Sequence, residues 1–160
     1  MKMSALRPIL VLAPMAWMLG LATATALAGS RAVGVPAYAV SAAIYEIGSL
    51  LCHQLPARSF HVWGAQLPVC ARCTGLYIGA AGAAIVATQL SAGLQRRVWN
   101  RARSLTLLGA LPTAVTLIVE WFSGHTPGNW TRAAAGFPLG AIVMLIILAS
   151  TALESAVEIH

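Results

Sequence analysis

Every cysteine of the chain lies within one short stretch that also contains two histidines. Cys52 is followed by Cys70 and Cys73, which form a Cys-x-x-Cys pair, and His53 and His61 lie between Cys52 and that pair. Thiolates and imidazoles are the ligands of closed zinc sites, and the Cys-x-x-Cys spacing lets two sulfurs bind one ion. The three cysteines and one histidine would therefore make a four-ligand metal site.

The donor set predicts zinc as the bound metal, with iron or copper as alternatives because thiolates favour soft metal ions. The fourth ligand is either of two histidines. His53 directly follows Cys52 in the chain, and the side chains of adjacent residues seldom point the same way, so His61 competes for this position. The site would be structural, would handle a metal or would transfer electrons.

Redox chemistry at the same cysteines is the second hypothesis. Arg72 lies between the sulfurs of Cys70 and Cys73, and a helix is expected to begin directly after them, so two features stabilise a thiolate. Cys52 would be the third thiol, which exchanges with a Cys70–Cys73 disulfide. The chain would then be a membrane thiol-disulfide oxidoreductase that uses a quinone. A third hypothesis is a small transporter or assembly factor in which a disulfide is only structural.

Three further polar residues occupy the stretch that holds the cysteines. Arg58, Ser59 and Gln66 could hold a metal ligand in position, or bind the phosphate of a lipid headgroup or a substrate. The alternative is that they cap helices and satisfy the backbone of the loop.

Two carboxylates interrupt apolar segments, where a charged group needs a partner. These are Glu46 and Glu120. We expect Glu120 to form an ion pair with Arg132 across a short turn, and the alternative is a role in proton or cation passage. Asn129 or Thr131 is expected to cap the last helix.

Two blocks of the sequence resemble the DUF2085 family of membrane proteins. The first block contains CHQLPARSF at residues 52–60 and PVCARCTGLY at residues 68–77, and the second contains NWTR at residues 129–132 and Gly136. The resemblance covers about residues 36–145 and implies a multi-span membrane protein without implying an activity. The family often has an Asp-Gly pair near the end of the third span, where this chain has Glu120 and Trp121.

The composition excludes a water-soluble globular domain. Of the 160 residues, 59% are hydrophobic and only 9% are charged, whereas soluble domains are roughly 25% charged. Charged residues are absent from 8–30, 32–45, 73–95, 104–119 and 133–153, and a membrane-spanning helix needs about 20 apolar residues. We predict an all-α integral membrane protein, a small bundle of about four transmembrane helices plus one interfacial or re-entrant helix.

The expected elements follow from these runs. Residues 1–30 form a first transmembrane helix or a signal-like segment, and residues 31–160 form a single membrane domain. In that domain we expect an interfacial helix at 36–51, a polar connector at 52–73, and spans at about 74–94, 104–122 and 132–152. The helix at 36–51 would be about 24 Å long, which is short of a span.

The distribution of basic residues predicts how the chain lies in the cell's inner membrane. Four of the ten basic residues lie between two spans, which marks the cytoplasmic side: Arg96, Arg97, Arg101 and Arg103. The cysteine connector lies one span away and should face the outer, periplasmic side. The net charge of +6 is thus a topology signal, and the expected partner is the lipid bilayer rather than nucleic acid.

Small residues recur at every fourth position in two of the spans, which lets helix backbones approach closely. The glycines concerned are Gly75 and Gly79 in one span and Gly136 and Gly140 in another. Such faces would join helices within the chain or join two copies as a homo-oligomer.

Overall fold

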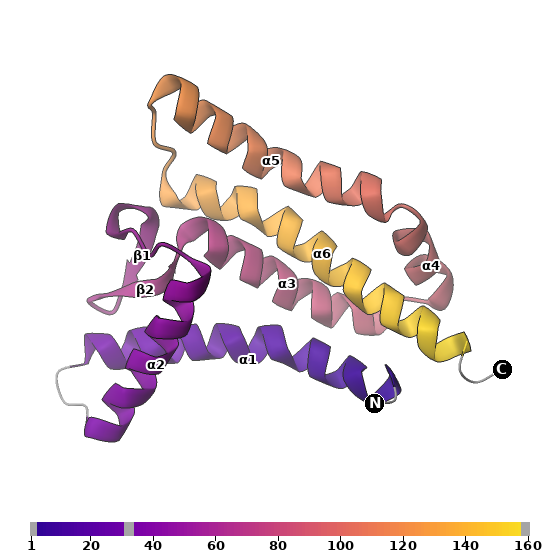
Figure 1. Cartoon of the computed structure of the whole chain (residues 1–160), viewed down its shortest axis with the longest axis horizontal. Helices are drawn as coiled ribbons and strands as arrows, with labels where there is room; N and C mark the ends of the chain where they lie inside the picture. The colour runs from indigo at the N-terminus through magenta and orange to yellow at the C-terminus, as the bar shows by residue number, and fades with distance from the viewer. Residues whose placement is uncertain (1–2, 31–33, 158–160) are drawn as a thin grey trace.

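The computed structural model describes residues 3–30 and 34–157, which form helices and one two-stranded hairpin (Figure 1). The elements are α1 (Met3–Gly29), α2 (Val35–Leu51), the 3-10 helix η1 (Pro56–Arg58), β1 (Ser59–Val62), β2 (Ala65–Cys70), α3 (Ala71–Gln89), α4 (Ala92–Asn100), α5 (Ala102–Ser123) and α6 (Asn129–Val157).

The prediction of an all-α membrane bundle is confirmed. Within the described ranges, four helices are long and apolar enough to cross a membrane: Leu6–Gly29, Ala71–Gln89, Ala102–Ser123 and Asn129–Glu154. The remaining apolar helix, α2, is shorter than a span. The described chain therefore has the predicted four long apolar helices and the predicted short apolar helix, together with the short polar helix α4.

The hairpin and the Arg-rich segment lie at opposite ends of the bundle (Figure 1). The β1–β2 hairpin and the turn between α5 and α6 share one end, while α4 and the two ends of the described chain share the other. Helix α2 is steeply inclined to the long helices and lies beside the hairpin. The cysteine stretch and the basic segment are thus separated by the full length of α3.

The predicted end of the second span is wrong. The span expected at 74–94 ends at Gln89, because Leu90 is extended (φ −75°, ψ 132°) and a new helix, α4, begins at Ala92. The expected Arg-rich loop is therefore largely helical. Its polar Gln95 is buried and donates from Nε2 to the Leu90 carbonyl oxygen at 3.1 Å, which ties α4 to the end of α3.

The polar connector expected at 52–73 is also more regular than predicted. It contains η1 and both strands, and Cys73 already lies in the first turn of α3. The hairpin forms because Trp63 and Gly64 both take positive φ angles of 54° and 80°, as the two central residues of a tight β-turn between paired strands require.

Helices α3 and α6 pack at the closest distance that their backbones allow. A Cβ atom on Gly75 would overlap the carbonyl oxygen of Ala133, and one on Gly140 would overlap the carbonyl oxygen of Leu76. Gly79 likewise faces the backbone of α6 at Phe137. The glycine faces therefore join two helices within one chain, which is the first of the two predicted alternatives.

The second half of α1 belongs to the core beneath the hairpin. Leu21, Ala24 and Thr25 are at most 1% exposed. Leu21 packs in one cluster with Cys52 and Val69. Helix α1 therefore supports the segment that carries the cysteines.

Candidate metal centre

A network of side-chain amides fixes the segment that follows α2 against the hairpin. Gln54 donates from Nε2 to the carbonyl oxygens of Tyr45 at 2.7 Å and Pro68 at 2.8 Å. Gln66 in β2 donates in return to the carbonyl oxygen of Gln54 at 2.6 Å. These hydrogen bonds bring Cys52 beside the end of β2, where Cys70 lies.

The three cysteine sulfurs converge. Their Sγ atoms all lie within 4.8 Å of one another, and all three residues are free thiols. Cys52 is buried, and its sulfur accepts a hydrogen bond from the backbone N–H of Cys70 at 3.1 Å. Sulfurs that share one zinc ion at about 2.3 Å lie roughly 3.8 Å apart, so the observed spacing is close to that of a metal-bound set.

The thiol of Cys70 is activated by its neighbours. A hydrogen bond from the side chain of Cys73 lowers the pKa of Cys70 below its ordinary value, and this effect outweighs desolvation, which raises it. The thiolate is the form of cysteine that binds metals and that attacks disulfides. The local chemistry therefore suits both hypotheses made from the sequence.

The histidines are placed differently from each other. His53 lines a cavity of about 380 Å³ together with the three cysteines. Both histidines are exposed, and His61, which lies on β1, is not among the residues that line this cavity. Among the described residues, the group of converging donor atoms consists of the three cysteines, without either histidine.

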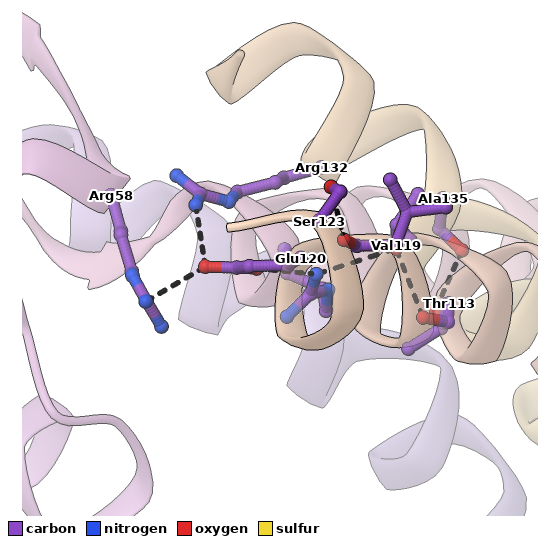
Figure 2. A network of polar contacts seen from close by, with 9 residues as sticks. Arg58, Thr113, Val119, Glu120, Ser123, Arg132 and Ala135 are labelled. Carbon is purple, nitrogen blue, oxygen red and sulfur yellow. Dashed lines mark hydrogen bonds and ion pairs between the residues drawn. The ribbon is translucent and has the colours of Figure 1, made fainter. Parts of the chain in front are cut away.

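An arginine cluster forms the other wall of the same cavity. Glu120 of α5 forms ion pairs with three arginines. Its Oε1 lies 2.7 Å from Nη2 of Arg58 and 3.0 Å from Nη2 of Arg132, and its Oε2 lies 3.8 Å from Nη2 of Arg72. Figure 2 shows Arg58 and Arg132 reaching Glu120 from two different segments of the chain. The predicted pair of Glu120 and Arg132 is confirmed, and two further arginines join it.

The position of Arg58 and Arg72 beside Glu120 was not predicted from the sequence. The available signal was that both flank the cysteines and that the sequence has no acidic residue between Glu46 and Glu120. Arg72 also donates to the hydroxyl of Thr116 on α5 at 3.3 Å.

The remaining polar residues hold the hairpin rather than line the cavity. Ser59 is buried, donates to the carbonyl oxygen of Leu55 at 3.0 Å and accepts from Gln66 at 3.3 Å. Neither Ser59 nor Gln66 is among the residues that line the cavity. Glu46 is exposed on α2.

Asn129 does not cap α6, contrary to prediction. Helix α6 begins at Asn129 itself, so that Thr131 lies inside its first turn. The amide of Asn129 instead donates from Nδ2 to the Ser59 carbonyl oxygen at 3.0 Å, and its Oδ1 has no hydrogen-bond partner. The residue joins α6 to the hairpin because the hairpin packs against the start of this helix.

Comparison with known proteins agrees with this architecture. The sequence is similar to an uncharacterised protein of Methanocaldococcus jannaschii, with 30% identity over 109 residues that cover 68% of this chain and 69% of the relative. An uncharacterised protein of Methanothermobacter thermautotrophicus is 30% identical over 90 residues, which cover 56% of this chain and 78% of the relative. No solved structure matches. The family described as predicted membrane protein (DUF2085) matches residues 52–146, which include the whole cysteine and arginine site, and the chain belongs to this family.

Proposed function

We propose that Cys52, Cys70 and Cys73 bind one metal ion, with zinc as the first candidate and iron or copper as alternatives. The observation that carries this proposal is the convergence of the three sulfurs within 4.8 Å. Three thiolates make up most of a four-coordinate zinc shell. The bound ion would fasten the segment after α2 to the start of α3, in a structural, metal-handling or electron-transfer role.

The metal proposal is tested by elemental analysis of protein purified in dodecyl maltoside, with a thiol count on the same sample after denaturation. We expect about one metal ion per chain and three reactive thiols, as many as the chain has cysteines. Cys70→Ser should lose the metal while its helical circular dichroism is retained. Wild-type protein with no metal and a single reactive thiol would contradict the proposal.

The fourth ligand is tested with the two histidines as a matched pair. Both histidines are exposed, but His53 lines the cavity beside the cysteines and His61, on β1, does not. If His53 completes the shell, His53→Ala should weaken metal affinity by tenfold or more, on the scale of 10 to 100 that even indirect disturbance of ligands produces. His61→Ala should leave the affinity unchanged in a competition titration with a chelator. If both variants bind the metal with the same affinity, His53 is not the fourth ligand. A water molecule or another group in the cavity would then occupy that position.

A second candidate function is oxidation of thiols to a disulfide by a quinone, followed by thiol-disulfide exchange. The convergence of three sulfurs within 4.8 Å favours it. Oxidation of Cys70 and Cys73 to a disulfide would release two protons and two electrons, which a quinone takes up to become a quinol. Cys52 would then exchange with this disulfide. The single-thiol outcome of the count above would support this function, and reduction of an added quinone by the dithiol form would test it.

The membrane orientation is proposed on charge. Because Arg96, Arg97, Arg101 and Arg103 lie at the end of the bundle opposite the hairpin, the positive-inside rule favours an outward-facing cysteine site. The site would then be reached from the periplasmic face of the inner membrane.

A further inference from the structure

The arginine cluster carries more positive charge than its one carboxylate can balance. Arg58, Arg72 and Arg132 surround Glu120, so two positive charges remain. Within the described part of the chain, no acidic side chain lines the adjoining cavity. A zinc ion held by three thiolates would carry one net negative charge, which would still leave one positive charge unbalanced.

The helix ends add to this excess. Arg72 is the second residue of α3 and Arg132 is the fourth residue of α6. The amino ends of helices carry partial positive charge, and neither helix has an acidic residue in its first turn. Two arginines therefore occupy positions where an anion, rather than a cation, is stabilised.

Two of the guanidinium groups also have buried donors without partners. The side chain of Arg132 is only 4% exposed and that of Arg72 is 19% exposed. The Nε atoms of both are buried and make no hydrogen bond within the described structure. Because an unpaired buried donor is costly, these groups point to a missing acceptor.

We propose that the cavity of about 380 Å³ binds an oxyanion of the phosphate class through Arg58, Arg72 and Arg132. Arginine presents a planar fork of donors that matches phosphate oxygens. The phosphate belongs either to a free ion or to a lipid headgroup, and the exposed apolar side chains of Leu51 and Leu55 at the cavity wall suit a lipid. The proposal rests on the arginines and does not need a metal at the cysteines.

The test measures stabilisation by two probes in dodecyl maltoside, a detergent without phosphate. Inorganic phosphate and phosphatidylglycerol are each added to wild-type protein, to Arg58→Gln and to Arg97→Gln, and thermal unfolding is followed by circular dichroism. Arg58 is 43% exposed, so its replacement should not prevent folding. Arg97 is exposed on α4 at the far end of the bundle and provides the same charge change outside the cavity.

We expect at least one probe to raise the unfolding temperature of wild-type protein and Arg97→Gln, because a ligand that binds only the folded state stabilises it. In Arg58→Gln the concentration needed for half of this effect should rise on the order of tenfold, as for a lost charge-assisted contact. A response to inorganic phosphate identifies a free ion, and a response to phosphatidylglycerol alone identifies a headgroup.

Two outcomes would overturn the anion site. One is a wild-type protein that responds to neither probe, and the other is an Arg58→Gln variant that responds at the same concentrations as Arg97→Gln. Arg132→Lys, which keeps the charge but loses the fork, gives a second readout and should also respond less than wild type. Metal content is measured in every sample. A response to phosphate in protein without metal would support the anion site even if the metal proposal fails.

Discussion

Glu120→Gln should destabilise the folded protein by about 3 to 5 kcal/mol, the usual effect of removing one partner from a buried ion pair. Glu120 is only 6% exposed and is the carboxylate that receives Arg58 and Arg132 on the same oxygen. Glutamine keeps the size of the side chain and removes its charge. Three guanidinium groups would then remain at one end of the bundle without a counter-charge.

The matched control for this variant is Glu46→Gln, which makes the same chemical change at an exposed position of α2. A surface change of this kind should alter stability by no more than about 0.5 kcal/mol. Unfolding of both variants is measured in phosphate-free buffer. If the two variants lose equal stability, Glu120 does not hold the arginines together. If Glu120→Gln loses more, added phosphate should restore part of its stability, because phosphate would supply the missing negative charge.

Gly79→Ala should destabilise the bundle by about 1 to 3 kcal/mol, the typical effect of overpacking. A Cβ atom at Gly79 would overlap the carbonyl oxygen of Phe137 and approach the backbone nitrogen of Ala141 at 3.0 Å. Both contacts are with the backbone of α6, which cannot move aside as a side chain can. The two helices would have to separate over their whole contact.

Gly82→Ala on the same helix is the control, because a Cβ atom there would meet nothing within 4 Å. Alanine is the better helix former, so this variant should gain roughly 0.5 to 1 kcal/mol. The two substitutions should therefore shift the unfolding temperature in opposite directions. Destabilisation of both variants by the same amount would mean that the effect is not caused by the contact between α3 and α6.

The spans were predictable because the bilayer requires long runs without charge, and those runs are visible in the sequence. Their ends were less predictable. Leu90 ends α3 although it is as apolar as the helix before it, and the short α4 follows within three residues. Hydropathy predicts which segments lie in the membrane, but it does not predict the residue at which a helix ends.

The cysteine group could be predicted because its members lie close together in the sequence. The hairpin between them was not predicted because its turn requires a positive φ angle at Trp63, a conformation that tryptophan seldom adopts. The arginine cluster was found only as the pair of Glu120 and Arg132, which one short turn connects. Arg58 joins it through the packing of the hairpin against α6, which the hydrogen bond from Asn129 to Ser59 supports.

Helix α1 is the element whose packing bears on how the chain matures. The sequence predicts either a first transmembrane helix or a signal-like segment here. Leu21 packs with Cys52, and a Cβ atom on Gly29 would overlap the Trp63 carbonyl oxygen. Loss of α1 would remove Leu21 from the cluster that it forms with Cys52 and Val69 and would leave these two residues uncovered on that side. Assembly of the cysteine group in this arrangement would thus require that α1 stays attached to the rest of the chain.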